Sequence, residues 1–190
     1  MGQARPAVAL SAADFLAWET QQPSRHEYVD GEVFAMAGGD DRHMTVAGNV
    51  YMALRKHLRG SPCSVYMSEV RTFIQAANCY FYPDVFVTCS DRDRAERLHK
   101  HDPLLVVEVL SPSTAAFDRG AKFAAYRQAD SLQEVVFIDT DSRLTDVHRK
   151  GADGLWVLHP FAAGDSMRLA SVDLLLPPEL LWADVPDGPR

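Results

Sequence analysis

An apolar run near the middle of the chain, LLVVEVLSPST at residues 104–114, predicts a buried β-strand. Its apolar residues are β-branched or aliphatic, and a Ser-Pro pair ends the run. One charged residue, Glu108, interrupts it. Because side chains in a strand alternate between two faces, Glu108 shares a face with Val106 and Leu110, and the intervening valines point the other way. The pattern therefore places a carboxylate in an apolar layer.

A short helix and a hairpin are predicted near the start of the chain. Ser11 and Asp14 form a capping-box pattern, which is typical of the first turn of a helix. The segment HEYVDGEVFAMAG at residues 26–38 has two β-rich arms. Between them lies Asp30-Gly31, a dipeptide that readily takes the positive φ of a tight turn.

A longer helix is predicted over residues 43–58, where apolar residues recur at helical spacing. Asp40 or Asp41 can cap its start. His43 lies in the first turn, where the helix dipole disfavours a protonated imidazole. We therefore expect a neutral His43, which suits a hydrogen-bonding or ligating role.

Two strands are predicted at residues 63–75 and 78–89, joined by a short turn. Pro83-Asp84 interrupts the second one, and because proline has no amide hydrogen, strand pairing must lapse there or reach a sheet edge. The mixed-charge segment 90–102 is predicted to be a solvated loop or a frayed helical turn. A DNA-contacting loop is the alternative, but its acidic residues nearly cancel its basic ones.

The rest of the chain alternates helix and strand. A helix containing residues 122–129 follows the central strand, and Gly120 weakens any helix that spans it. Residues 134–150 predict a hairpin around Asp141-Ser142, and 155–160 and 167–177 read as further strands.

Length and charge limit the class of protein. With 190 residues, 47% of them hydrophobic, the chain is long enough for one well-buried core. We predict a single domain over residues 1–190, with a short flexible N-terminus and a frayed tail from about residue 186. A net charge of -7 argues against a protein that coats nucleic acid by bulk electrostatics, although local contact with a metal offsetting the acids is compatible with it.

The cysteines and the apolar runs of the sequence bear on where in the cell the protein is expected. Cys63, Cys79 and Cys89 are odd in number and have no CxxC spacing, so neither a disulfide framework nor a zinc knuckle is predicted. The chain start lacks the apolar core of a signal peptide, and no run reaches the ~18 apolar residues of a membrane span. We expect a cytoplasmic protein with no membrane partner.

Three residues in order can support chemistry: Asp84 after the strand break, Glu108 in the strand and Lys122 on the next helix. If the two strands are neighbours, the two carboxylates can converge and bind Mg²⁺ or Mn²⁺ through oxygen ligands. Such a metal could polarise a phosphodiester, with the Lys122 ammonium stabilising the developing charge.

Each of these residues also has a structural interpretation. Glu108 could pair with a buried lysine, arginine or backbone donor in place of a cation. Lys122 could form a weak surface pair with Asp118, four residues before it. Asp84 could cap a turn after the proline.

The combined motifs identify a family. HEYVDGEV, a helix that begins near His43, FYPDVFV, VVEVLSPST followed by DRGAKFAAYRQA, and EVVFID together resemble the Uma-two family of bacterial proteins known as restriction endonuclease homologues. That family belongs to the PD-(D/E)XK nuclease-like superfamily. The resemblance implies an α/β (α+β) fold with a restriction-endonuclease-like mixed β-sheet core flanked by helices.

The resemblance also implies site residues. Asp84 matches the acid of the PD element and Glu108 the (D/E) position, both as metal ligands, and Val109 would offer its backbone carbonyl. The superfamily lysine is missing, since residue 110 is Leu, and in Uma-two-like sequences it moves to the following helix, here Lys122.

Two weaker matches lie earlier in the chain. Glu27 resembles an early acidic residue of such nucleases, and His43 a histidine at the start of the first core helix. Either could instead be structural, Glu27 as a solvent-facing hairpin residue and His43 as a helix-start hydrogen bonder.

The leading hypothesis is a Mg²⁺- or Mn²⁺-dependent endonuclease that hydrolyses DNA. A homodimer is expected, because a nuclease that cuts both strands can do so with two copies. The alternative is a catalytically inactive module of the same fold that binds DNA or a protein partner, and a third hypothesis is hydrolysis of another phosphoester.

Overall fold

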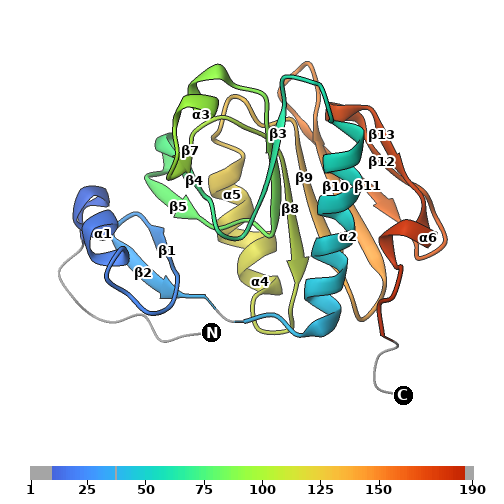
Figure 1. Cartoon of the computed structure of the whole chain (residues 1–190), viewed down its shortest axis with the longest axis horizontal. Helices are drawn as coiled ribbons and strands as arrows, with labels where there is room; N and C mark the ends of the chain where they lie inside the picture. The colour runs from blue at the N-terminus through green and yellow to red at the C-terminus, as the bar shows by residue number, and fades with distance from the viewer. Residues whose placement is uncertain (1–9, 37, 187–190) are drawn as a thin grey trace.

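The computed structural model describes residues 10–36 and 38–186. The predicted flexible N-terminus, up to residue 9, and the predicted frayed tail after residue 186 lie outside the described residues. Two main sheets and a small hairpin make up the β-structure, and helices cover the larger sheet on both faces (Figure 1).

The larger sheet has six strands in the order β11-β10-β9-β8-β6-β3. The central pair, β8 and β9, is parallel, and the other neighbours are antiparallel, so the sheet is mixed. Parallel neighbours need a crossover, which the helical segment between β8 and β9 supplies. The strands are β3 (Ser64–Met67), β6 (Val85–Thr88), β8 (Pro103–Leu110), β9 (Glu134–Asp139), β10 (Leu144–Lys150) and β11 (Trp156–Phe161).

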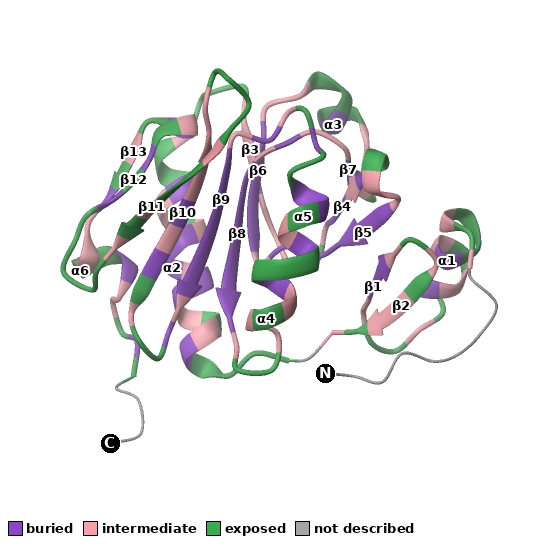
Figure 2. Ribbon diagram, turned by 180° about the vertical axis from the view of Figure 1, so that it is seen from behind, coloured by how far each residue is buried: buried purple, intermediate pink, exposed green. Residues whose placement is uncertain are grey.

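Helix α2 (Asp41–His57) covers one face of this sheet, and the crossover covers the other (Figure 2). The crossover consists of α4 (Ala115–Phe117), a π-helical turn (Asp118–Lys122) and α5 (Phe123–Tyr126). The alternation predicted for β8 is confirmed, because its Val107 and Val109 join the core under α2 while its other face joins the core under α5. The strand is purple along its length in Figure 2, buried on both faces.

The smaller sheet has five strands in the order β2-β1-β5-β4-β7 and carries α1 at its edge. The predicted hairpin is confirmed, since Asp30 and Gly31 have φ of 44° and 101°. Ser11 caps the helix as predicted, accepting from the Asp14 amide at 3.1 Å, and the Asp14 carboxylate accepts from the Ser11 hydroxyl at 2.6 Å. Its elements are α1 (Ala12–Glu19), β1 (His26–Val29), β2 (Glu32–Ala35), β4 (Arg71–Ile74), a 3-10 turn (Gln75–Ala77), β5 (Cys79–Phe81) and β7 (His99–Lys100).

The two strands predicted at 63–75 and 78–89 are each broken in two, which corrects the prediction. The first splits into β3 and β4 at a turn in which the Val70 amide bonds the Met67 carbonyl at 3.1 Å. No glycine or proline marks that turn. The second splits into β5 and β6 at Pro83-Asp84, as the proline indicated. At both breaks the chain passes between the two sheets.

The C-terminal region holds another correction. Residues 167–177 read as one strand, but they form a hairpin, β12 (Met167–Leu169) and β13 (Leu174–Leu176), around a 3-10 turn (Ala170–Val172). Asp173 closes that turn with φ of 49°, a conformation that aspartate tolerates better than most residues. The apolar pattern is compatible with either arrangement. A short helix, α6 (Pro178–Leu181), follows.

The mixed-charge segment 90–102 is more ordered than predicted. It contains α3 (Asp91–Ala95), and Asp93 is fully buried. The Asp93 carboxylate accepts hydrogen bonds from the Thr88 hydroxyl at 2.7 Å and from the amides of His101 and Asp102 at 2.7 and 3.0 Å. Lys100 is buried and donates to the Asp93 carbonyl. The alternating charges of this segment therefore gave no sign that Asp93 and Lys100 are buried and hold the loop together by hydrogen bonds.

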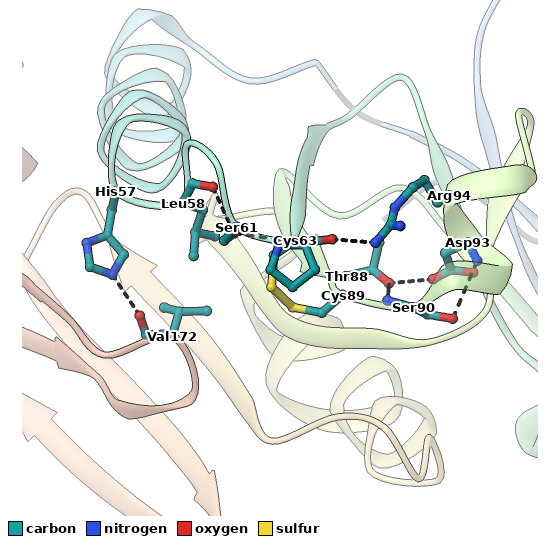
Figure 3. The surroundings of a disulfide bond; sticks show 11 residues. His57, Leu58, Ser61, Cys63, Thr88, Cys89, Ser90, Asp93, Arg94 and Val172 are labelled. Carbon is teal, nitrogen blue, oxygen red and sulfur yellow. Dashed lines mark hydrogen bonds between the residues drawn. A yellow bond between two sulfur atoms is a disulfide. The ribbon is translucent and has the colours of Figure 1, made fainter.

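The cysteine prediction was wrong for two of the three residues. Cys63 and Cys89 form a disulfide across the ends of β3 and β6 (Figure 3). Ser64 faces Thr88 in the ladder, so the cysteines occupy the next position along the two strands. Cys79 is free and buried. An odd count shows only that at least one cysteine is unpaired, and the pairing depends on register, which spacing does not give.

Among the described residues, no helix is both long and apolar enough to cross a bilayer.

Candidate functional site

An open cavity of about 420 Å³ lies where the two sheets and the start of α2 meet. The five side chains predicted for the site come from different elements: β1, the break between β5 and β6, the first turn of α2, β8 and the π-helical turn. Four of them line the cavity, and the fifth, Glu27, contacts one of those four. The structure thus brings together Glu27, His43, Asp84, Glu108 and Lys122.

Lys122 lies at the centre of this group. Its Nζ is 2.8 Å from Oε1 of Glu27, 2.9 Å from Oε1 of Glu108 and 3.6 Å from Oδ1 of Asp118. The lysine on the helix therefore reaches back to the strand carboxylate. The interpretation of Lys122 and Asp118 as a surface pair is wrong, since Lys122 is only 4% exposed and Asp118 is also buried.

Glu108 is 3% exposed and has two partners at the same oxygen. Oε1 accepts from the Tyr126 hydroxyl at 2.6 Å and pairs with Lys122. Burial raises the pKa of Glu108 well above its usual value, with neighbouring carboxylates adding to the effect and Lys122 opposing it. The ion pair considered as a structural explanation for Glu108 is therefore present, but it does not outweigh the effect of burial, which disfavours the charged form of the carboxyl group.

The ammonium group of Lys122 stays charged in this setting. Burial would lower the pKa of Lys122, but the three carboxylates around it outweigh burial and raise that pKa well above its usual value. Burial and then Glu108 likewise raise the pKa of Tyr126 well above its usual value, so the phenol remains a donor. The site thus has one permanent cation and one permanent hydroxyl donor.

Asp84 is held by the neighbouring strand and by α2. Its Oδ2 accepts from the Val109 amide at 2.7 Å and lies 3.2 Å from Nε2 of His43. These contacts are not those of an aspartate that caps its own turn. The strand break at Pro83 leaves this carboxylate beside β8, where it adds to the charge felt by Glu108.

His43 differs from the expectation of a neutral imidazole. Burial would lower the pKa of His43, but its hydrogen bond to Asp84 and the charge of that carboxylate outweigh burial and raise the pKa above its usual value. The backbone of Val109 also raises the pKa of His43. A direct carboxylate contact outweighs the helix dipole here.

The donor set fits a hard divalent cation. Among the described residues, neither Oδ1 of Asp84 nor Oε2 of Glu108 has a hydrogen bond or ion pair, while the other oxygen of each carboxylate is engaged. Both residues and Val109 line the same cavity. No group of three or more His, Cys, Asp or Glu suited to a metal is found in the described ranges. Mg²⁺ needs only one or two carboxylates and takes its other ligands from water and phosphate.

Three residues of this group were missed or undervalued from the sequence. Neither Tyr126 nor Tyr82 was predicted to belong to the site, although the Tyr82 amide donates to Oε1 of Glu27 at 3.3 Å, and Asp118 was considered only as a surface partner of Lys122. Tyr126 lies four residues after Lys122, so the helical spacing could have placed both on the face that meets Glu108.

Comparisons with known proteins agree with this architecture. Residues 12–180 match the model of the Uma2 (Uma-two) family, described as "Putative restriction endonuclease". Two uncharacterized proteins of Synechocystis sp. are similar: slr1290 is 36% identical over 93% of either chain, and sll1609 is 31% identical over 78% of this chain and 85% of its own.

A solved structure has the same fold. It is a nuclease of Anabaena variabilis, described as "putative" and as belonging to DUF820, with a TM-score of 0.77, 16% identity, and coverage of 92% of this chain and 98% of its own. At that identity the likeness concerns the fold alone. The mixed sheet core flanked by helices is thus that of a nuclease-like fold, and the chain belongs to the Uma2 family.

Proposed function

We propose that this protein is a metal-dependent endonuclease that hydrolyses DNA phosphodiester bonds. The observation that carries the proposal is the pair of unengaged carboxylate oxygens, on Asp84 and Glu108, that share a cavity with a charged lysine. The descriptions of the family and of the Anabaena structure support a nucleic-acid substrate. The fold alone would not, since one fold hosts many activities.

The proposed cofactor is Mg²⁺ or Mn²⁺, held by Asp84, Glu108 and the Val109 carbonyl. When bound, such an ion would polarise the phosphodiester and lower the pKa of an attacking water. Hard oxygen donors and the excess of carboxylates over cations in the cavity favour this class of metal over zinc.

The side chains around the metal site would have separate roles. The Lys122 ammonium would stabilise the negative charge that develops on the phosphate oxygens. Glu27 and Asp118 would hold Lys122 in place, since both lie on its Nζ. Tyr126 would orient Glu108, and His43 would orient Asp84, because each contacts one carboxylate oxygen and leaves the other oxygen unengaged.

Cleavage of supercoiled plasmid tests the proposal. Wild-type protein should nick or linearise the plasmid with Mg²⁺ or Mn²⁺ and not with EDTA, and Asp84→Asn and Lys122→Met should each lose the activity. Arg127→Gln is a suitable control, because Arg127 is exposed and contacts Phe123 outside the cavity. Cleavage that persists in Asp84→Asn would point to a contaminating nuclease or another site.

A second candidate function is a catalytically inactive module that binds DNA or a protein. It is favoured by the contact between Lys122 and Glu108, because an ion pair that is already formed can serve the fold alone. Absence of cleavage across DNA and simple phosphoesters, with DNA binding retained, would support it. Homodimer formation and a cytoplasmic location remain predictions, and light scattering on the purified protein would test the first.

A further inference from the structure

A second cavity adjoins the candidate site and contains an arginine that has no hydrogen-bond or ion-pair partner in the part of the chain that the structure describes. This cavity has a volume of about 300 Å³ and shares Ser24, Arg25, Glu69 and Tyr82 with the first one. Arg71, at the start of β4, lines it and is 7% exposed. Among the described residues, no hydrogen bond or ion pair reaches its guanidinium group.

Arg71 is a largely buried residue whose guanidinium nitrogens reach the cavity and have no hydrogen-bond partner among the described residues. Moving a cation out of water costs several kcal/mol unless an anion or hydrogen-bond acceptors meet it. The one close partner of the Arg71 guanidinium in the described part of the chain is the Tyr82 ring, whose centroid lies 5.8 Å from Cζ. The five N–H donors of Arg71 therefore remain available to a ligand in the cavity.

A second guanidinium faces the same ring. Arg25 has its Cζ 5.7 Å from the Tyr82 centroid and lines both cavities. Arg25 is half-exposed and forms an ion pair with Glu69, which is itself exposed. A surface ion pair of this kind contributes little to stability. A ligand with a higher negative charge can therefore replace Glu69 as the ion-pair partner of Arg25.

The buried acid of this cavity, Glu19, already has hydrogen-bond partners. Glu19 accepts hydrogen bonds from the His26 amide at 2.9 Å, from Nδ1 of His26 at 3.0 Å and from the Tyr82 hydroxyl at 3.0 Å. It makes no ion pair with Arg71. The cavity is thus lined by two arginines and two carboxylates: Arg71 has no ion pair, Arg25 pairs with the exposed Glu69, and Glu19 is engaged by His26 and Tyr82.

We propose that Arg71 and Arg25 form a subsite for a backbone phosphate of the bound DNA strand, next to the phosphate that is cleaved. Guanidinium groups bind phosphate oxygens in a bidentate manner, which fixes a strand in register without reading its sequence. Tyr82 links the two cavities, because its ring contacts both arginines and its backbone amide bonds Glu27 of the candidate site. This inference rests on the proposed function for the identity of the strand, and it adds a positioning role for Arg71.

Binding of a short fluorescein-labelled DNA duplex in EDTA tests the subsite without cleavage. Arg71→Gln should weaken binding about tenfold, as expected for loss of a charge-assisted hydrogen bond. It should also reduce the slope of log K against log salt by about 0.9, the value for one phosphate contact. Glu69→Gln should tighten binding, because it frees Arg25. Arg127→Gln, another arginine over an aromatic ring, should leave both quantities unchanged.

The outcomes separate this inference from the proposed function. If Arg71→Gln and Arg127→Gln bind DNA equally well, or if wild-type protein binds no DNA, the subsite is wrong, whatever the cleavage assay gives. If binding depends on Arg71 but no plasmid is cleaved, the subsite stands and the endonuclease proposal fails. Competition by inorganic phosphate that depends on Arg71, without any effect of Arg71 on DNA affinity, would assign the cavity to a free phosphate and overturn the proposal.

A second pair of variants covers the case in which Arg71→Gln does not fold. Arg25→Gln changes a half-exposed side chain and should weaken DNA binding, and Glu69→Gln should strengthen it. Changes of opposite sign in DNA affinity for Arg25→Gln and Glu69→Gln support the subsite. An ion pair that serves only the fold would change DNA affinity equally in the two variants or not at all. Equal effects on DNA affinity from both variants would contradict it.

Discussion

The replacement Glu108→Gln separates a structural ion pair from a metal ligand. It keeps the shape of the side chain and an oxygen that can accept from Tyr126, but it removes a carboxylate that pairs with Lys122 and is repelled by Asp84, Asp118 and Glu27. If the ion pair serves the fold, the variant should be much less stable. If Glu108 is instead a metal ligand, the replacement should not lower the free energy of unfolding of the metal-free protein.

The contacts of Glu108 indicate the sign and rough size of the change in the free energy of unfolding. At 2.9 Å the attraction between Lys122 and Glu108 is about 6 kcal/mol at an effective dielectric constant of 20. Burial of Glu108 and repulsion from its three acidic neighbours oppose it, and the raised pKa of Glu108 shows that the opposing effects prevail. We therefore expect the free energy of unfolding of Glu108→Gln, in EDTA at pH 7, to equal that of wild type or exceed it by about 1–2 kcal/mol, since each unit by which folding raises a carboxyl pKa corresponds to about 1.4 kcal/mol. Lys122 keeps Glu27 and Asp118 as partners in this variant.

Lys122→Met provides the contrast. It leaves Glu27, Glu108 and Asp118 without their common cation, so we expect a loss of about 3–5 kcal/mol, typical of breaking a buried pair at one partner. Urea unfolding followed by tryptophan fluorescence measures both variants. A loss of more than about 2 kcal/mol in Glu108→Gln would refute the reasoning and favour a structural pair.

Three further predictions concern the fold and the pH dependence. Reduction of the Cys63–Cys89 disulfide should lower the free energy of unfolding by roughly 3 kcal/mol, whereas the double variant Cys63→Ala/Cys89→Ala should show no effect of reductant in the same urea titration. Because Asp84 raises the pKa of His43, the contribution of His43 to stability should be complete below pH about 6.5 and be lost as the pH rises through the folded-state pKa. His43→Gln should therefore flatten a metal-free stability profile above about pH 6.5. Asp93→Ala should cost roughly 2–4 kcal/mol by thermal unfolding, since it leaves a hydroxyl and two amides without their acceptor, while Asp91→Ala on the exposed side of the same helix should cost less than about 0.5 kcal/mol.

The sequence predicted the parts of the site that depend on local chemistry. The period of two in β8 placed Glu108 in an apolar layer, and Pro83 marked the break that exposes Asp84. Both features follow from rules that act over a few residues. The family resemblance then pointed to Lys122, and the structure brings its ammonium group to the Glu108 carboxylate.

Several features that the sequence did not reveal depend on contacts between residues that are not neighbours in the chain. The pairing of Cys63 with Cys89 follows from the register of β3 against β6, and the burial of Asp93 from donors at both ends of its loop. The raised pKa of His43 comes from a carboxylate 41 residues away in the printed sequence, which outweighs the local helix dipole. Local patterns carry no record of such contacts.

Titration of Mn²⁺ by calorimetry tests most directly whether Asp84 and Glu108 share a cation. We predict one saturable site in wild-type protein in the presence of a short DNA duplex, lost in Asp84→Asn and in Glu108→Gln and retained in Arg127→Gln. Loss in only one of the two carboxylate variants, or binding that survives in both, would contradict a shared site. Absence of binding in wild type, even with DNA to complete the coordination, would contradict the metal-dependent account altogether.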